Sequence, residues 1–108
     1  MTSAKQLVEL IRDGKVTSRT LVEQSFARID ETDAEIKAWA YLDREGALSR
    51  ADEMDTIRGS GRPLGPLHGV PIGLKDIIDT KTMPTECGTL LMAGRRPDDD
   101  AALVERLL

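Results

Sequence analysis

The side chain with the clearest potential for chemistry is Lys75, which lies in a short apolar run, residues 70–78, bounded by glycine and proline. This run predicts a strand buried on both faces, as in α/β sheets. An ammonium group is costly to remove from water, so a buried lysine must find a partner or lose its proton. A neutral lysine can serve as a general base. The alternative is that Lys75 lies at the mouth of the strand, solvated or paired with a carboxylate.

A cysteine provides a candidate nucleophile for a second scheme. Cys87 could act with Glu86 and Lys75, or with His68 as its base. Adjacent loop residues rarely converge on one point, and His68 belongs to a Gly- and Pro-rich turn where a structural hydrogen bond is expected. Asp76 would lie on the opposite face of the strand from Lys75, because side chains alternate along a strand. It is therefore predicted to bind backbone groups in the turn that follows.

Helices are expected to support this strand in the first half of the chain. Ser3 can cap a helix that Gly14 ends. Thr17 or Ser18 can cap a second helix, which the polar residues 30–33 are expected to end. Its apolar residues recur at helical spacing and predict one face that covers the core: Leu21, Val22, Phe26 and Ile29.

The remaining elements follow from shorter signals. Residues 37–42 weakly predict a short strand, and Asp43 can cap a third helix. Residues 1–62 are thus expected to be mainly helical, and residues 63–108 to hold the lysine strand, a loop and a last helix. The adjacent aspartates 98–100 are predicted to cap that last helix. A calcium site is the less favoured interpretation, because they lack the alternating ligand spacing of an EF-hand.

Three stretches follow one another along the chain: G-P-L-H-G-V-P-I-G-L-K-D (residues 65–76), M-P-T-E-C-G-T (83–89) and D-A-A-L-V-E-R-L (100–107). In this order they resemble the amidase signature family, whose members are serine hydrolases with a Ser–cis-Ser–Lys triad. The resemblance implies that Lys75 is the triad lysine. The Gly- and Ser-rich segment that supplies both serines in the family does not occur in these 108 residues.

The resemblance also implies a fold and a substrate site. The fold would be α/β: the N-terminal part of a single α/β/α domain with a mixed sheet, truncated before the serine-bearing segment. Residues beside the substrate channel would be Met83, Thr85 and Gly88. Gly73, two residues before Lys75 and on its face of the strand, would leave room for a neighbouring segment.

The function implied is that of an amide-bond hydrolase fragment, which supplies the general-base lysine and lacks activity alone. A small-molecule amide would be the substrate, and no cofactor or metal is expected. The alternatives are the glutaminase subunit of an amidotransferase complex, or a non-catalytic interaction fragment. Possible partners are therefore a second copy of the chain or the other subunits of such a complex, because unpaired strand edges invite association.

Composition restricts the expected binding partners and cellular location. The net charge of −4 is well mixed along the chain, so the sequence offers no basic face for nucleic acid or an anionic membrane. The single cysteine fits a reducing compartment. No apolar run in the sequence is long enough to span a bilayer, and no signal-peptide pattern is present. A cytoplasmic location is expected.

Overall fold

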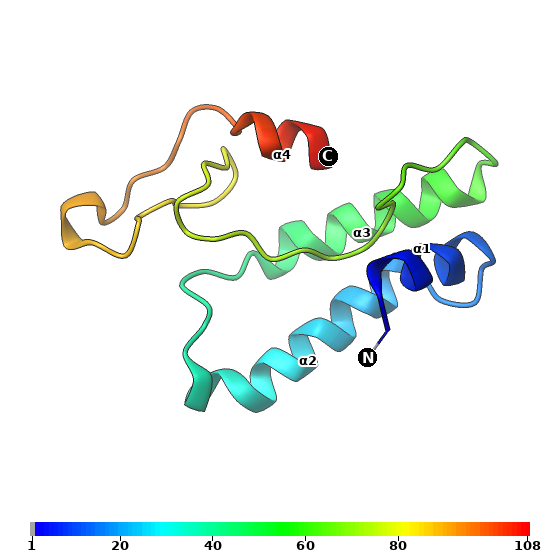
Figure 1. Ribbon diagram of the computed structural model, residues 1–108, viewed down its shortest axis with the longest axis horizontal. Coiled ribbons are helices and arrows are strands. Elements are labelled where there is room, and N and C mark those ends of the chain that lie inside the picture. Colours follow the sequence, from blue (N-terminus) through cyan, green and yellow to red (C-terminus); the bar gives the residue numbers. More distant parts are fainter. Residues whose placement is uncertain (1) are drawn as a thin grey trace. The chain divides into compact units, whose positions relative to one another are not determined.

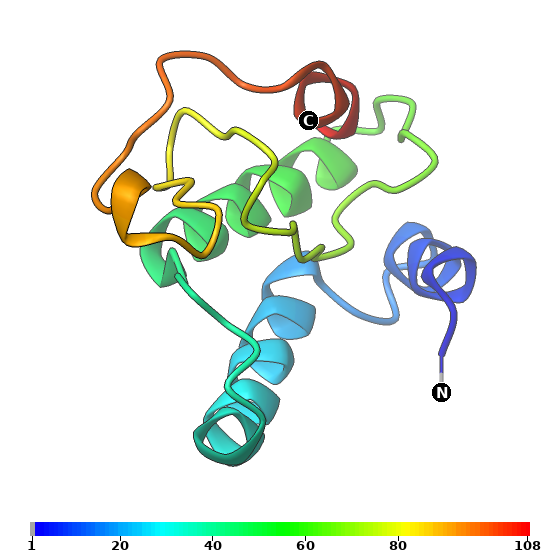
Figure 2. The same ribbon diagram turned by 60° about the vertical axis from the view of Figure 1, so that its left-hand side comes forward.

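The computed structural model describes residues 2–108 and separates them into two compact units. Residues 2–38 and 43–72 form the helical unit, and residues 39–42 and 73–108 form the loop unit. The helical unit contains three helices: α1 (Ala4–Arg12), α2 (Ser18–Ile36) and α3 (Arg44–Gly59) (Figure 1). The loop unit follows a long irregular path that includes one 3₁₀ turn, η1 (Leu90–Met92), and ends in α4 (Ala102–Leu107) (Figure 2).

The starts of α1, α2 and α3 are those predicted from the capping residues. Ser3 forms a capping box with Gln6: the Ser3 hydroxyl accepts from the Gln6 amide at 3.2 Å, and the Gln6 side chain accepts from the Ser3 amide at 2.8 Å. Thr17 caps α2, and Asp43 caps α3 by accepting from the Gly46 amide at 2.9 Å. These bonds satisfy amides that the first turn of a helix leaves without a partner.

The predicted end of the second helix is wrong, because α2 continues through the polar residues 30–33 to Ile36. Asp30 forms an ion pair with Arg44 of α3, whose guanidinium also lies over the Phe26 ring, 4.7 Å from its centroid. A polar residue on the outer face of a helix does not end it when its side chain finds a partner there. Contacts between helices thus override the local signal.

The core of the helical unit is built from one face of each helix. Ile11 is fully buried, and the predicted apolar face of α2 is confirmed by the burial of Leu21 and Val22. Phe26 is half-buried. The buried apolar side chains of this unit are Val8, Ile11, Leu21, Val22 and Ala51. No helix in residues 2–108 has the length and apolar composition that a membrane span requires.

The segment after α3 is fixed to this core by close contacts. The His68 ring nitrogen Nε2 lies 2.9 Å from the Met54 carbonyl oxygen, which confirms the structural hydrogen bond predicted for this histidine. Gly69 adopts a φ of +71°, and a Cβ atom there would lie 2.0 Å from the Ser18 hydroxyl oxygen. A glycine is required at this position by both the backbone conformation and the space.

Neither of the two predicted strands, residues 37–42 and 70–78, is present in the part of the chain that the structure describes. That part has helices as its only regular elements, so the predicted α/β class is wrong for residues 2–108. A strand needs hydrogen bonds to a neighbouring strand. Lys75 instead begins a turn, in which its carbonyl oxygen accepts from the amides of Ile77 at 2.7 Å and Ile78 at 3.0 Å.

The aspartates before α4 also differ from their predicted role. The N-cap residue of α4 is Ala101, and no side chain caps the helix there. Asp100 instead accepts from the Lys81 amide at 2.8 Å and lies 3.7 Å from the Lys81 ammonium. The start of α4 is held by its backbone, because the Ala101 amide donates to the Asp79 carbonyl oxygen at 2.9 Å.

Candidate active site

Lys75 lies at the end of an irregular segment in the loop unit, and its side chain is exposed. The predicted burial of this lysine is therefore wrong for residues 2–108. Within that part of the chain its ammonium forms no hydrogen bond or ion pair. Its place is set by the backbone turn that starts at its own carbonyl group and by the residue that follows it.

That following residue, Asp76, binds two backbone amides of the loop. Its Oδ1 accepts from the Glu86 amide at 2.8 Å, and its Oδ2 accepts from the Gly88 amide at 3.4 Å. The prediction that Asp76 bonds backbone groups is confirmed, although these groups lie ten residues or more along the chain. Cys87 and Gly88 both have left-handed backbones, with φ of +54° and +67°. A turn can direct successive backbone amides toward one point, where an anion can bind them.

An arginine holds the same loop from its other side. The guanidinium of Arg95 forms two hydrogen bonds with Asp79, at 2.7 Å and 2.8 Å. Its Nη1 also lies 3.4 Å from the Thr85 carbonyl oxygen, to which it donates. The hydrogen bonds from Arg95 lower the pKa of the Asp79 carboxyl, and the same bonds raise the pKa of Arg95. A paired fork of this kind fixes both position and orientation.

The residues predicted to border the substrate channel have different surroundings. Thr85 is 1% exposed, and its hydroxyl donates to the Ile78 carbonyl oxygen at 3.5 Å while its amide donates to the Arg95 carbonyl oxygen at 3.0 Å. Met83 is half-buried and Gly88 is exposed. Of the three, Met83 and Gly88 therefore offer surface to a ligand in this structure, and Thr85 supports the loop from within.

Two of the three partners proposed for Cys87, His68 and Glu86, are engaged elsewhere. The His68 ring binds the Met54 carbonyl group, and the Glu86 carboxylate accepts from the Gly94 amide at 2.5 Å. Cys87 itself is an exposed free thiol. These contacts give the cysteine schemes no support. Within residues 2–108 no cluster of histidine, cysteine or acidic residues is arranged to hold a metal ion.

Two contacts of the loop unit were not predicted by name. The Asp79–Arg95 pair joins residues sixteen positions apart, and no local pattern marks them as partners. Trp39 lies against Gly73, where a Cβ atom would come within 2.9 Å of the indole ring. Gly73 thus allows another segment to come close, as predicted, but that segment carries Trp39 and is not the serine-bearing segment that the family places there.

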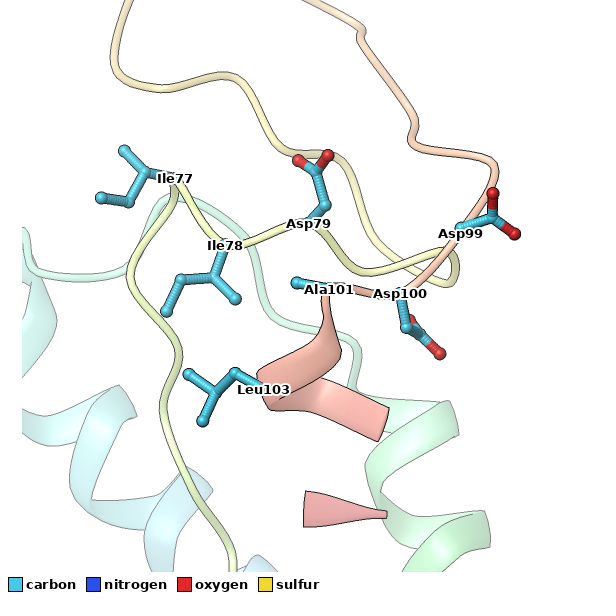
Figure 3. Close-up of a pocket in the computed structure, with 7 residues that line it drawn as sticks. All are labelled: Ile77, Ile78, Asp79, Asp99, Asp100, Ala101 and Leu103. Carbon is cyan, nitrogen blue, oxygen red and sulfur yellow. The ribbon is translucent and has the colours of Figure 1, made fainter. Parts of the chain in front are cut away.

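The loop unit also contains an open cavity of about 430 Å³ (Figure 3). Its lining combines apolar and acidic residues: Ile77, Ile78, Asp79, Asp99, Asp100, Ala101 and Leu103. Lys75 and the three predicted substrate residues are not among those that line it. The cavity is therefore distinct from the predicted catalytic lysine.

Comparison with known proteins identifies the class. Residues 20–108 match the family model described as Amidase, and the chain belongs to this family. It superposes with a TM-score of 0.91 on the native peptide amidase from Stenotrophomonas maltophilia, at 38% identity over 98% of this chain and 22% of that one. A structure of a vestigial protein complex, which reveals the origins of an s-triazine catabolic enzyme, gives the same TM-score at 31% identity over 99% of this chain and 23% of that one.

Curated relatives point to one kind of protein, a subunit of glutamyl-tRNA(Gln) amidotransferase. The protein of this name from Salinispora arenicola is 39% identical over 105 residues, which are 97% of this chain and 21% of the relative. Its counterpart from Chloroflexus aggregans is 43% identical over 95 residues, 88% of this chain and 20% of the relative. The chain thus spans about a fifth of the length of these relatives and corresponds to the N-terminal part of the amidase signature fold.

Proposed function

We propose that this chain supplies the N-terminal part of an amide-bond hydrolase, and that Lys75 is the general base of its Ser–cis-Ser–Lys triad. The observation that carries the proposal is the position of Lys75 within the family match, residues 20–108, on a backbone that superposes on a peptide amidase. The residues before it, G-P-L-H-G-V-P-I-G-L, support the same assignment. The mixed sheet of the family would then form when residues 70–78 find neighbouring strands.

The mechanism uses Lys75 in its uncharged form. The amine accepts a proton from a bridging serine held by a cis peptide bond, and that serine deprotonates the nucleophilic serine. The nucleophile attacks the amide carbonyl carbon, and backbone N–H groups stabilise the resulting oxyanion. The proton held by Lys75 returns through the bridging serine to the leaving nitrogen, so that ammonia or an amine departs, and water then releases the acid from the acyl-enzyme. The serines and the cover that shields Lys75 from water would come from the part of the relatives' length that this chain does not span.

The substrate would lie against the loop at residues 83–88. Met83 and Gly88 present surface there, and we assign them to substrate contact. Thr85 would shape the channel through its buried hydrogen bonds to Ile78 and Arg95. The substrate class is a small-molecule amide, and the mechanism calls for no cofactor.

The first test is an assay of the purified 108-residue chain on simple primary amides. We expect no turnover, because both serines are required. Turnover that Lys75→Ala abolishes would contradict the proposal that the serines come from elsewhere.

The second test is a hybrid enzyme, in which this chain replaces the superposing part of the Stenotrophomonas maltophilia peptide amidase. Lys75→Ala is expected to lower kcat of the hybrid by roughly 10²–10⁴-fold, the usual contribution of a general base. Lys81→Ala is the matched control, because Lys81 is an exposed lysine of the same unit. Equal activity of the two variants would refute the role of Lys75.

A second candidate is the glutaminase subunit of an amidotransferase complex. The curated relatives described above carry the name of an amidotransferase subunit, at 39% and 43% identity. The same lysine chemistry would then release ammonia from glutamine within a multi-chain assembly in the cytoplasm. Co-purification of the protein with partner subunits from its own cells favours this candidate, and its recovery as a free amidase favours the first.

Association of the isolated chain is also part of the proposal. Leu90 and Leu91 of η1 are 94% and 95% exposed, and apolar side chains exposed in this way favour association. We expect oligomers or aggregates of the 108-residue chain by light scattering. A sharp monomer peak with cooperative melting would count against this expectation.

A further inference from the structure

We propose that Asp76 is a positioning residue that fastens the turn at residues 86–88 to the segment carrying Lys75. Its carboxylate joins two parts of the loop unit that the proposed reaction needs at a fixed separation. On one side is the predicted catalytic lysine, one residue before Asp76, and on the other is Gly88, predicted to border the substrate. The role of this contact in catalysis rests on the proposed function, whereas the contact itself is independent of it.

The geometry of the carboxylate supports this role. Each of its two oxygens accepts from a different amide, that of Glu86 at 2.8 Å and that of Gly88 at 3.4 Å. Cys87, between them, has a φ of +54°, a conformation that a residue other than glycine keeps only where its surroundings enforce it. Asp76 provides that enforcement, because it binds the amides on both sides of Cys87.

The other contacts of this turn lead elsewhere. The Glu86 carboxylate accepts from the Gly94 amide, and the Glu86 carbonyl oxygen accepts from the Thr89 amide at 3.1 Å. The Thr85 amide and carbonyl groups bind Arg95. These bonds tie the turn to residues that come after it in the chain. Among the described hydrogen bonds of residues 86–88, only the two accepted by Asp76 involve a residue that comes before the turn in the chain.

The adjacency of Lys75 and Asp76 makes the coupling direct. The Asp76 backbone cannot move away from the 86–88 turn while its carboxylate is bound, and the Lys75 backbone follows that of Asp76. The turn after Lys75, closed by the Ile77 and Ile78 amides, limits rotation about the intervening bonds. The backbone of Lys75 and the turn at residues 86–88 are therefore held together in an otherwise irregular unit.

Residue-resolved amide hydrogen exchange of the hybrid enzyme tests this contact. In Asp76→Ala, the Glu86 and Gly88 amides are expected to exchange at least about tenfold faster than in the parent hybrid, the factor that corresponds to one net hydrogen bond. Asp76→Asn retains one acceptor oxygen, so it should protect one of the two amides, and the shorter bond favours Glu86. Asp99→Ala, at an exposed aspartate of the same unit, should leave both amides unchanged. Unchanged exchange at both amides in Asp76→Ala would overturn the proposal.

The hybrid enzyme separates positioning from simple structural support. Asp76→Ala is expected to raise KM on the order of tenfold with a smaller fall in kcat, because the substrate loop loses its attachment. Activity that falls at unchanged KM, in proportion to folded protein, would overturn the positioning role. If Lys75→Ala leaves the hybrid active while hydrogen exchange behaves as expected, the proposed function fails and the Asp76 contact stands.

Discussion

The two units of this chain are stabilised in different ways. In the helical unit, apolar side chains from all three helices are buried, among them Ile11 and Leu21. In the described part of the loop unit, Val104 is the one buried apolar side chain, and Thr80 and Thr85 are buried polar residues. Carboxylates bound to backbone amides take the place of a core there. Apolar burial is non-directional, whereas each of these polar contacts depends on one particular pair.

In both units an aspartate accepts hydrogen bonds from two backbone amides, but the surroundings of the two aspartates differ. Asp55 accepts from the amides of Ser18 and Arg19 at the start of α2, at 2.8 Å and 3.1 Å. Asp76 accepts from two amides of an irregular turn in the same way. The first contact lies beside a packed core and adds to it. The second has no such core around it, so we expect the loop unit to open locally before the helical unit does.

The largest expected effect is on the core of the helical unit. Ile11→Ala should lower the free energy of unfolding by about 2–5 kcal/mol, because it leaves a cavity at a fully buried position. Urea unfolding followed by far-UV circular dichroism measures this loss. The control is Ile36→Ala, at an isoleucine that is 65% exposed, which should change the value by no more than about 0.5 kcal/mol. Similar losses at the two positions would contradict a core centred on Ile11.

A smaller loss is expected where the backbone after α3 meets α2. In Gly69→Ala the new Cβ would meet the Ser18 hydroxyl at 2.0 Å, and this overpacking should cost about 1–3 kcal/mol. Gly61→Ala is the matched control: its φ of +73° is nearly the same, but nothing lies within 4 Å of the new Cβ. The same unfolding measurement gives the difference between the two variants. Equal losses would mean that backbone conformation alone requires the glycine.

The smallest expected effect is the loss of the Asp79–Arg95 contact of the loop unit at low pH. Since Arg95 lowers the pKa of Asp79 in the folded chain, its stabilising contribution is present above the ordinary aspartate pKa of about 3.9 and is lost as the pH falls through the lowered folded value. Acid should therefore shift the Thr85 amide resonance, followed by NMR, before helical circular dichroism changes. Asp79→Asn should abolish this shift, and Asp99→Asn should preserve it. Loss of helices at a higher pH than the Thr85 shift would contradict the comparison.

The sequence allowed prediction of the features that local residues determine. Ser3, Thr17 and Asp43 cap their helices because each bonds amides within three residues. The segment at residues 70–78 carries a strand-like apolar pattern, but the pattern cannot form a strand without a neighbour to pair with. Burial of Lys75 failed for the same reason, since it depended on that sheet.

The contacts of the loop unit were harder to predict. Asp79 and Arg95 pair across a long irregular stretch. Trp39 and Gly73, which are in contact, are separated by even more residues in the sequence. Irregular segments have no period from which a partner can be inferred. The alternation of side chains along a strand predicts that Asp76 binds backbone groups, but it does not indicate that these are the Glu86 and Gly88 amides.

The most direct test of the central claim compares Lys75→Arg with Lys75→Ala in the hybrid enzyme. An arginine keeps the positive charge but does not lose its proton in proteins, so it cannot accept one from a serine. If Lys75 is a general base, kcat of the arginine variant should fall as far as that of the alanine variant. If the arginine variant retains activity near that of the parent hybrid, Lys75 contributes only charge, and the proposed mechanism is wrong.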